Sequence, residues 1–456
     1  MSSRKWSAES LQILEQAWHC CAGYLRTLEN RAVAPSAAAI AALARLDEPL
    51  PAQPSAPEQT LALLDELVSP ATMAMAGPRF FGFVIGGALP AALAANWLAG
   101  AWDQNAAFAS ATPGVAQVEQ IALRWLIELF DLPAQTAGAF VTGGTVANFT
   151  ALAAARHAVL ARAGWNVESD GLFGAPPITV IAGEEAHPSL LKSLGMLGLG
   201  RSRIVRVPVD GQGRMRADAL PSMAGPSILC LQAGNVNTGA CDPFIELIDA
   251  AHRQGAWVHI DGAFGLWAKV AAKHRRLVEG VEQADSWATD AHKWLNVPYD
   301  SGVALVRDAH ALSAAMAVTA DYLPTGSAGR NPCDYTPELS RRARGVEVWA
   351  ALRSLGRAGI EELVRRNCAQ AREFATRLTA AGHEVLNEVV LNQVLVAFGE
   401  AERTRRVVTA LQQEGTCWCG ITVWQGRTAM RISVSNWSTD DADVERSIAA
   451  MLRVAR

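Results

Sequence analysis

The sequence has few charged residues, and neither sign predominates. Lys, Arg, Asp and Glu make up 18% of the 456 residues, and the formal net charge is −4. Nucleic-acid binding needs a basic patch and intrinsic disorder needs a composition poor in hydrophobic residues, whereas 50% of this chain is hydrophobic. We therefore expect a globular protein that acts on a small molecule, with no nucleic-acid partner.

The sequence also lacks the cysteine spacing of a zinc site, a signal-peptide core and any apolar run long enough to span a membrane. Its eight cysteines include no CxxC pair, so we expect free thiols, a reducing compartment and no metal. The longest apolar run, Ala88 to Trp102, is shorter than the roughly 20 residues that cross a bilayer, and we expect a buried helix there. These absences predict a cytoplasmic protein without membrane association.

Apolar segments bounded by turn residues recur through the middle of the chain and alternate with helical patterns. They lie at 139–142, 178–182, 202–207, 227–233, 256–261, 286–289 and 302–306. Short runs that are apolar throughout predict strands buried on both faces, so we expect a largely parallel sheet in an α/β domain. A first helix is expected at 7–30, and five prolines at 34–57 predict a surface linker. A long amphipathic helix at 359–382, followed by shorter apolar runs, predicts a small α+β domain.

The first candidate site is the segment FVTGGTVANF, in which a strand is predicted to end at Thr142 and a helix to begin near Thr145. Gly143 and Gly144 allow a tight turn, and the free N–H groups of a helix start can bind phosphate. The alternative is an ordinary strand-to-helix turn in which Thr145 caps the helix. Taken alone, this segment favours the ordinary turn.

Three further candidates follow other predicted strands. Asp261 ends the strand in AWVHIDGAFG, and ligands of open α/β sheets collect at the carboxyl ends of strands. His187 follows ITVIA, and Lys293 lies beside His292 in WATDAHKWLN. Each has an ordinary alternative, namely a capping aspartate, a structural histidine, and a lysine whose ammonium group reaches the surface.

The four candidates become specific when they are taken together. A phosphate-binding helix start, a histidine, an aspartate and a desolvated lysine at strand ends are the groups that pyridoxal 5′-phosphate (PLP) requires. The lysine forms a Schiff base, and the aspartate keeps the pyridine nitrogen protonated so that the ring withdraws electrons. The sequence therefore predicts PLP as the cofactor.

The motifs GGT…AN, AHPS, HIDGAFG and DAHKWLN occur in this order, and the chain resembles the group II PLP-dependent amino acid decarboxylases, which include aromatic-L-amino-acid decarboxylase. The resemblance covers roughly residues 75–440. It implies the aspartate-aminotransferase-like PLP fold type I, with a seven-stranded, mostly parallel sheet in a large domain and a small α+β C-terminal domain. It also implies a homodimer with shared active sites and three parts of the chain, at 1–105 for dimerisation and the pocket, 106–335 for PLP and 336–456 for the small domain.

The resemblance also implies contacts to the cofactor for seven residues. Lys293 forms the Schiff base, Asp261 pairs with the ring nitrogen, and His187 stacks on the ring and takes part in catalysis. The remaining contacts, to the other face of the ring and to the phosphate, are implied for Ala263, Gly144, Thr145 and His292.

A loop tyrosine protonates the substrate carbon in the aromatic-amino-acid branch of the family, and members with phenylalanine there form aldehydes. Tyr335 is the candidate because DY precedes RR, at Arg341 and Arg342, although the spacing is shorter than in the aromatic decarboxylases. The alternative is that Tyr335 is a packing residue. Tyr322 is a less favoured candidate.

The predicted substrate pocket is apolar and aromatic, with Phe81, Phe83, Val84, Trp102 and Gln104. Such a lining suits an aromatic or bulky uncharged side chain. We expect decarboxylation of such an L-amino acid to an amine and CO2. The alternatives are an aminotransferase, a decarboxylation-dependent aldehyde synthase and a PLP-binding protein without activity.

Arg431, in AMRISVSN, is similar to the aminotransferase arginine that pairs with the substrate carboxylate. A decarboxylase must hold that carboxylate loosely, so the sequence assigns Arg431 no role.

Overall fold

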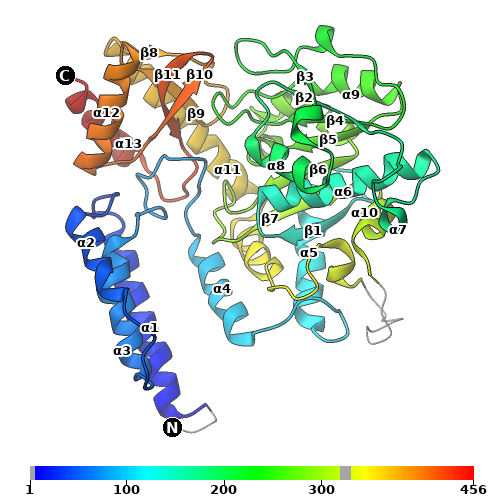
Figure 1. Ribbon diagram of the computed structural model, residues 1–456. Coiled ribbons are helices and arrows are strands. Elements are labelled where there is room, and N and C mark those ends of the chain that lie inside the picture. Colours follow the sequence, from blue (N-terminus) through cyan, green and yellow to red (C-terminus); the bar gives the residue numbers. More distant parts are fainter. Residues whose placement is uncertain (1–5, 319–329) are drawn as a thin grey trace.

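A seven-stranded sheet forms the centre of the computed structural model, which describes residues 6–318 and 330–456 (Figure 1). The strands are β1 (Ala137–Val141), β2 (Thr179–Gly183), β3 (Val205–Val207), β4 (Ser227–Gln232), β5 (Trp257–Asp261), β6 (Ser286–Asp290) and β7 (Gly302–Val306). Their order across the sheet is β1-β7-β6-β5-β4-β2-β3. Strand β7 is antiparallel to β1 and β6, and the other neighbouring pairs are parallel. The predicted mostly parallel sheet and the α/β class are confirmed.

Helices cover both faces of this sheet. One face is covered by α6 (Gly144–Arg162), α8 (Pro188–Met196) and α10 (Ala309–Met316), and the other by α5 (Pro113–Leu129), α9 (Phe244–His252) and α11 (Gly345–Ala380). In β4, Ile228 and Cys230 pack with the first group, whereas Leu229 and Leu231 pack with the second. Because successive side chains of a strand point to opposite faces, a strand buried on both sides is apolar throughout.

A second, antiparallel sheet lies near the C-terminus, with the order β10-β11-β9-β8. Its strands are β8 (Glu384–Val385), β9 (Gln393–Ala397), β10 (Gly420–Trp424) and β11 (Arg427–Ser433), and its helices are α12 (Ala401–Glu414) and α13 (Asp441–Val454). Helix α11 contacts both this unit and the central one, and Gly356 kinks it with a φ of 59°. The α+β character expected here is present, and the predicted boundaries at 105/106 and 335/336 stay a prediction.

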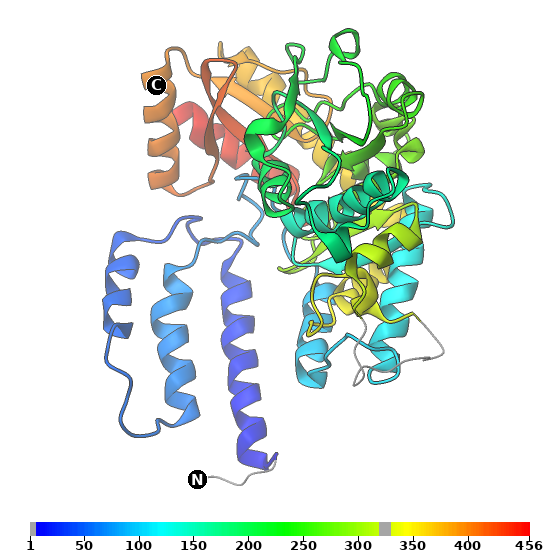
Figure 2. The ribbon, with the colours of Figure 1, turned by 45° about the vertical axis from the view of Figure 1, so that its right-hand side comes forward.

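The N-terminal part is helical, and its first three helices extend away from both sheets (Figure 2), whereas the fourth packs on α11. It contains α1 (Ala8–Thr27), α2 (Ala37–Ala42), α3 (Pro57–Leu63) and α4 (Pro90–Trp102), while the short α7 (Val167–Asp170) follows α6. The expected linker at 34–57 is wrong in part, because Ser36 caps α2 within it. A run of alanines there favours helix between the prolines.

Helix α4 is only half buried, which corrects the expected buried helix. Ala92, Ala95 and Ala99 are covered, whereas Trp97, Leu98 and Trp102 are 39%, 52% and 48% exposed. The small side chains allow α4 to pack closely on α11, so the bulky ones face outward. No helix within residues 6–318 and 330–456 has the length and hydropathy of a membrane-spanning helix.

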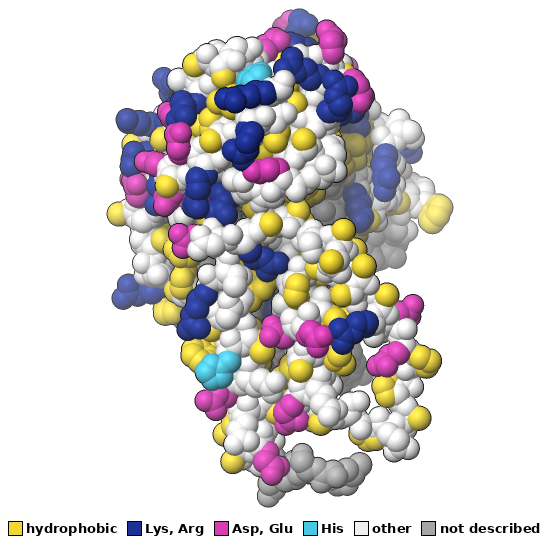
Figure 3. Space-filling view, turned by 90° about the vertical axis from the view of Figure 1, so that its left-hand side faces the viewer, with side chains coloured by type: hydrophobic (Ala, Val, Ile, Leu, Met, Phe, Trp, Pro, Cys, Tyr) yellow, Lys and Arg dark blue, Asp and Glu magenta, His cyan; other side chains and the backbone are white. Residues whose placement is uncertain are grey.

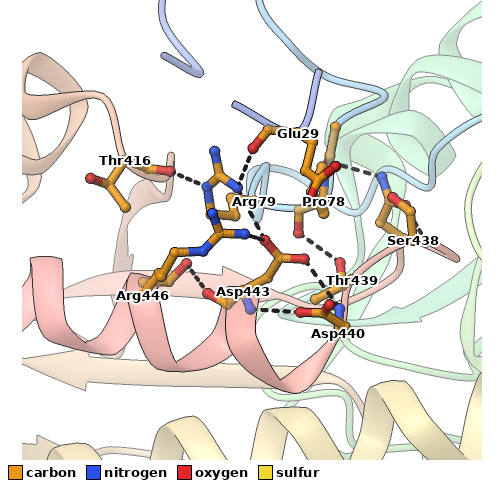
Figure 4. Close-up of polar contacts among 12 residues, drawn as sticks. Glu29, Pro78, Arg79, Thr416, Ser438, Thr439, Asp440, Asp443 and Arg446 are labelled. Carbon is orange, nitrogen blue, oxygen red and sulfur yellow. Dashed lines mark hydrogen bonds and ion pairs between the residues drawn. The ribbon is translucent and has the colours of Figure 1, made fainter. Parts of the chain in front are cut away.

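A buried ion pair joins the N-terminal segment to the second sheet (Figure 4). Arg79 Nη1 lies 3.0 Å from Asp443 Oδ1 on α13, and both side chains are nearly inaccessible. Arg79 also donates to the carbonyl oxygens of Thr416 and Glu29, at 2.7 and 2.8 Å. Arg446 donates to the same carboxylate at 2.6 Å, so both Arg79 and Asp443 have several partners.

Candidate active site

Three strands bring polar groups to one edge of the central sheet. Strands β5 and β6 are parallel neighbours that end at Asp261 and Asp290, and helix α6 begins at Gly144 just after β1. The carboxyl ends of parallel strands lie at the same edge, which is where ligands of α/β sheets bind. Lys293 follows Asp290 by three residues and reaches the same place.

Lys293 forms an ion pair with Asp290. Its Nζ lies 3.0 Å from Asp290 Oδ2, and the two side chains are 19% and 2% exposed. Within residues 6–318 and 330–456, Asp290 Oδ1 has no hydrogen-bond partner, although His292 Nε2 lies 3.8 Å away. The sequence reasoning did not assign Asp290, yet it ends an apolar strand as Asp261 does, and the same signal could have identified it.

The start of helix α6 faces this pair through two glycines. A Cβ atom on Gly144 would lie 2.8 Å from Asp290 Oδ2, and one on Gly143 would lie 3.4 Å from His292 Cε1. Gly143 is the N-cap residue, so Thr145 lies inside the helix and is not its cap. Because the two glycines carry no side chains, the Asp290 carboxylate comes close to the helix start, whose backbone N–H groups suit an anion such as a phosphate group. The residues present therefore fit the phosphate end of PLP.

Asp261 is held by two N–H groups. Its Oδ2 accepts from Asn148 Nδ2 of α6 at 3.1 Å, and its Oδ1 accepts from the backbone N–H of Ala263 at 3.2 Å. The residue is 4% exposed and lines a small cavity together with His187. A fixed carboxylate at the wall of this cavity fits the pyridine nitrogen of the cofactor.

His187 stands at the start of α8, where its Nδ1 accepts from the backbone N–H of Ser189 at 3.2 Å and lies 2.7 Å from the Ser189 hydroxyl. Burial lowers the pKa of His187, the charge of Asp261 opposes this shift, and the charges of Lys293 and Arg431 add to it. The predicted residues Lys293, Asp261 and His187 are thus brought within electrostatic range of one another. Arg431, on β11, is part of the same group and donates to the carbonyl of Val236 at 3.3 Å.

The chain after Lys293 is fastened by a residue that the sequence reasoning missed. Asn296 is fully buried with a φ of 56°, which asparagine tolerates better than most residues. Its Oδ1 accepts from the N–H groups of Gly87 and Trp437, and its Nδ2 donates to the carbonyls of Trp294 and Ser435. The lysine segment is thereby joined to residues from both the N-terminal part and the second sheet.

A tyrosine that was not considered from the sequence lies beside the predicted phosphate contact. The ring of Tyr299 stacks on the imidazole of His292, with centroids 4.3 Å apart. Tyr299 is 55% exposed; the neighbouring protein atoms and the charge of Asp290 raise its pKa, so the phenol keeps its proton at neutral pH.

Tyr335 makes packing contacts with the central sheet, including Ala288 of β6. It packs against residues of β1, β7 and α6, with the guanidinium of Arg330 3.8 Å above its ring. This environment matches the packing alternative, and the catalytic assignment of Tyr335 stays a prediction. Tyr322 lies outside the described residues.

The five predicted pocket residues occupy different environments. Phe81 packs on Phe374 in the core of the second sheet, and Val84 is buried in the core of the central unit, so neither is an exposed pocket residue. Phe83 is 54% exposed and stacks on Trp418 at 5.7 Å. Trp102 is exposed at the end of α4, and the Gln104 side chain donates to its carbonyl. The apolar character of Phe81 and Val84 reflects core packing, which sequence alone does not separate from a pocket lining.

Comparison with known proteins agrees with this geometry. Residues 41–399 match the family model for the pyridoxal-dependent decarboxylase conserved domain. The chain is 28% identical to tryptophan decarboxylase 1 of Oryza sativa subsp. japonica, over 93% of this chain and 89% of that protein. It is 31% identical to L-2,4-diaminobutyrate decarboxylase of Rhizobium meliloti (strain 1021), over 80% and 75% of the two chains.

The fold is shared with a solved structure of Oryza sativa TDC with PLP and tryptamine. The TM-score is 0.92 at 24% identity, and the match covers 100% of this chain and 99% of the other. PLP fold type I is thus confirmed. The chain belongs to the pyridoxal-dependent decarboxylase family and is a PLP-dependent carboxy-lyase.

Proposed function

We propose that the protein decarboxylates an aromatic or bulky apolar L-amino acid to its amine and CO2. The observation that carries this proposal is the meeting of Lys293, Asp261 and His187 at one sheet edge, beside a glycine-lined helix start. PLP, when bound, supplies an electron-withdrawing ring that stabilises the charge left on the substrate carbon when CO2 departs.

The protein's own residues divide the work of binding and proton transfer. We propose that Lys293 attaches the cofactor and that Asp290 holds its ammonium group in place beforehand. Asp261 pairs with the ring nitrogen, and Gly144, Thr145 and His292 hold the phosphate. His187 and Ala263 would contact the two faces of the ring.

The substrate class is supported by the rim of the site. Gly86 lies so close to the carbonyl of Lys293 that a side chain at this position would collide with it. Three residues earlier, Phe83 exposes its ring and stacks on Trp418, which stacks in turn on Phe80 with centroids 5.1 Å apart. Such an aromatic surface favours an aromatic side chain.

The test is a panel of L-amino acids assayed for CO2 and amine. It contains tryptophan, tyrosine, phenylalanine, leucine, 2,4-diaminobutyrate, aspartate and glutamate, because the relatives' names span very different substrates. We expect the highest kcat/KM among the first four. A preference for the diamino or acidic substrates would contradict the proposed class, and keto acid without CO2 would identify an aminotransferase.

Product analysis separates amine from aldehyde. An aldehyde synthase would convert amino acid, O2 and H2O to aldehyde, CO2, NH3 and H2O2, so H2O2 release identifies it. We expect amine from the wild-type protein. The variants Tyr335→Phe and Tyr299→Phe are compared, because Tyr335 is the predicted proton donor and Tyr299 is the tyrosine that lies beside His292.

We propose that a second copy of the chain covers the N-terminal helices. Helix α1 has no buried residue, and Leu11, Leu14, Trp18 and Leu25 are 57%, 52%, 47% and 39% exposed. Hydrophobic side chains lie at the surface of this part of the molecule (Figure 3). Exposed apolar faces of this kind mark interaction sites. Sedimentation should give a dimer, and Leu14→Glu with Trp18→Glu should give monomers; a wild-type monomer would contradict the proposal.

All eight cysteines are free thiols, which supports the proposed reducing, cytoplasmic location.

A further inference from the structure

A chain of five side chains runs beneath the sheet edge and ends on Asp261. Trp257 Nε1 donates to Ser286 Oγ at 2.9 Å, and Ser286 Oγ lies 2.9 Å from His259 Nδ1. His259 Nε2 lies 2.8 Å from Asn148 Oδ1, and Asn148 Nδ2 donates to Asp261 Oδ2 at 3.1 Å. These hydrogen bonds therefore connect buried residues of β5 and β6, through Asn148 of α6, to the carboxylate predicted to face the cofactor.

The direction of every hydrogen bond in this chain is fixed by its two ends. An indole N–H can only donate, so the Ser286 hydroxyl accepts from it. The hydroxyl donates to His259 Nδ1, because the neutral imidazole has one proton and needs it on Nε2 to meet the side-chain carbonyl oxygen of Asn148. His259 then carries its proton on Nε2 and donates to Asn148 Oδ1. At the other end the carboxylate can only accept, so the Asn148 amide must present its NH2 group there. All donors thus point toward Asp261, an arrangement in which neighbouring hydrogen bonds polarise one another.

The hydrogen-bonded side chains are also inaccessible to solvent, and the histidine among them does not change its charge at ordinary pH. Ser286, His259 and Asn148 are each 0% exposed. Burial lowers the pKa of His259 to about 3, so the imidazole stays neutral over the range in which enzymes work. If the Asn148 amide turned over, it would place an oxygen against the carboxylate and an NH2 group against the His259 N–H. His259 therefore locks the one amide orientation that serves Asp261.

We propose that His259 and Asn148 are positioning residues that hold Asp261 against the cofactor's ring nitrogen and keep that nitrogen protonated. The inference rests on the proposed role of Asp261. Their effect reaches the cofactor through the carboxylate alone. Weakening the chain lets the ring nitrogen lose its proton, the ring then withdraws fewer electrons, and the nitrogen that joins PLP to Lys293 becomes more basic.

The experiment follows the visible absorption of the holoprotein during a pH titration without substrate. Asn148→Leu and His259→Leu remove the donors, with Asn148→Leu keeping the branching of the side chain, and His259→Gln keeps an N–H near the position of Nε2. We expect the midpoint of the titration to rise by about one unit in the two leucine variants, the size of one lost hydrogen bond to a charged group. PLP should bind about 10-fold more weakly to both. Compared with His259→Leu, His259→Gln should bring both the titration midpoint and the PLP affinity most of the way back to the wild-type values.

Two reference variants make the outcome decisive. Asp261→Asn should shift the midpoint at least as far as the leucine variants; if it shifts nothing, the role of Asp261 is wrong. If Asp261→Asn shifts the midpoint and the leucine variants do not, the proposal for His259 and Asn148 is overturned. His274→Leu removes another buried histidine, 5% exposed and outside this chain, and should leave the titration unchanged.

A measurement on the unaltered holoprotein covers the case in which the leucine variants do not fold. Histidine labelled with 15N should show one residue, assigned by its loss in His259→Gln, that stays neutral with its proton on Nε2 from pH 5 to pH 9. A proton on Nδ1, or titration within this range, would overturn the proposal.

Discussion

Two buried ion pairs in this protein have the same separation and opposite surroundings. Lys293 and Asp290 lie 3.0 Å apart, as do Arg79 and Asp443. The Arg79 pair has further partners on both sides, including two backbone carbonyls and Arg446 (Figure 4). In the described residues Asp290 Oδ1 has no hydrogen-bond partner, and the glycines of the α6 start lie close to this carboxylate.

The difference teaches how to separate a structural pair from a functional one. A buried polar atom without a partner costs roughly 1–3 kcal/mol, and native proteins keep such atoms where a ligand or a reaction uses them. The distance within a pair is therefore uninformative. An unpartnered oxygen points to a ligand when it also lies at the carboxyl edge of the sheet, as Asp290 Oδ1 does, since Glu119 Oε1, in a buried pair with Arg341, has no hydrogen-bond partner in the described residues either. Arg79–Asp443 thus joins parts of the fold, whereas Lys293–Asp290 keeps an unused acceptor at the sheet edge, where we propose that the cofactor binds.

The largest expected effect comes from the cation of the functional pair. Lys293→Ala should lower kcat/KM by at least about 10²- to 10⁴-fold, the contribution of a positioned proton-transfer group, and abolish the visible absorption of bound PLP. The unfolding temperature should change little. Lys192→Ala, an exposed lysine near His187 on α8, is the control and should keep full activity.

The cation of the structural pair should show the reverse pattern. Arg79→Met leaves Asp443 buried without its main partner, which costs about 3–5 kcal/mol, so the midpoint of denaturant unfolding should fall markedly. The activity per folded molecule should be retained. Arg446→Met removes the half-exposed partner of the same carboxylate and should cost less than about 1 kcal/mol. Equal losses in the two variants would contradict the structural assignment.

The buried, neutral His259 should make the stability of the protein depend on pH in the acidic range. The pKa of His259 is lowered by burial to about 3, below the value of about 6.5 in an unfolded chain. Between these values the unfolded chain binds the extra proton, so stability falls as the pH falls through this window. Relative to neutral pH, protonation of this histidine in the unfolded chain should lower the free energy of unfolding by about 2–3 kcal/mol at pH 4.5. Thermal unfolding of His259→Gln should depend less steeply on pH between 7 and 4.5; parallel curves would contradict the burial argument.

The smallest effect is expected at the rim. Phe83→Leu should raise KM for aromatic substrates by about 2- to 10-fold, the value of one aromatic contact of roughly 0.5–1.5 kcal/mol, and leave KM for leucine nearly unchanged. Trp102→Leu, at the end of α4, tests the other exposed aromatic residue of the predicted pocket. A uniform rise in KM for all substrates would show that Phe83 shapes the site without selecting its occupant.

The central sheet and the main site residues could be predicted because their signals are local. Short apolar runs marked all seven strands, and the strand-end positions of Asp261 and Lys293 followed from the carboxyl-edge rule. The family resemblance then gave these residues their expected partners.

The remaining features depend on contacts between distant segments. The partners of Asn296 come from residues 87, 435 and 437, and no local pattern reports them. His259 looked like one more residue of a buried strand, although its imidazole meets α6 and β6. Phe81 packs in the core of the second sheet, and because an apolar residue beside a site and one in a core have the same sequence signal, its pocket role stays a prediction. Asp290 could have been predicted as a site residue, since the rule that selected Asp261 at the end of a strand applies to it equally.

The central claim, that Lys293 is the attachment site of the cofactor, can be tested directly. Borohydride reduction of the holoprotein makes the bond between PLP and its lysine permanent, and mass spectrometry of the digested protein locates it. The chain has five lysines, so each can be examined. The account predicts the pyridoxyl group on Lys293 alone. Its recovery on Lys5, Lys192, Lys269 or Lys273, with Lys293 unmodified, would contradict the account.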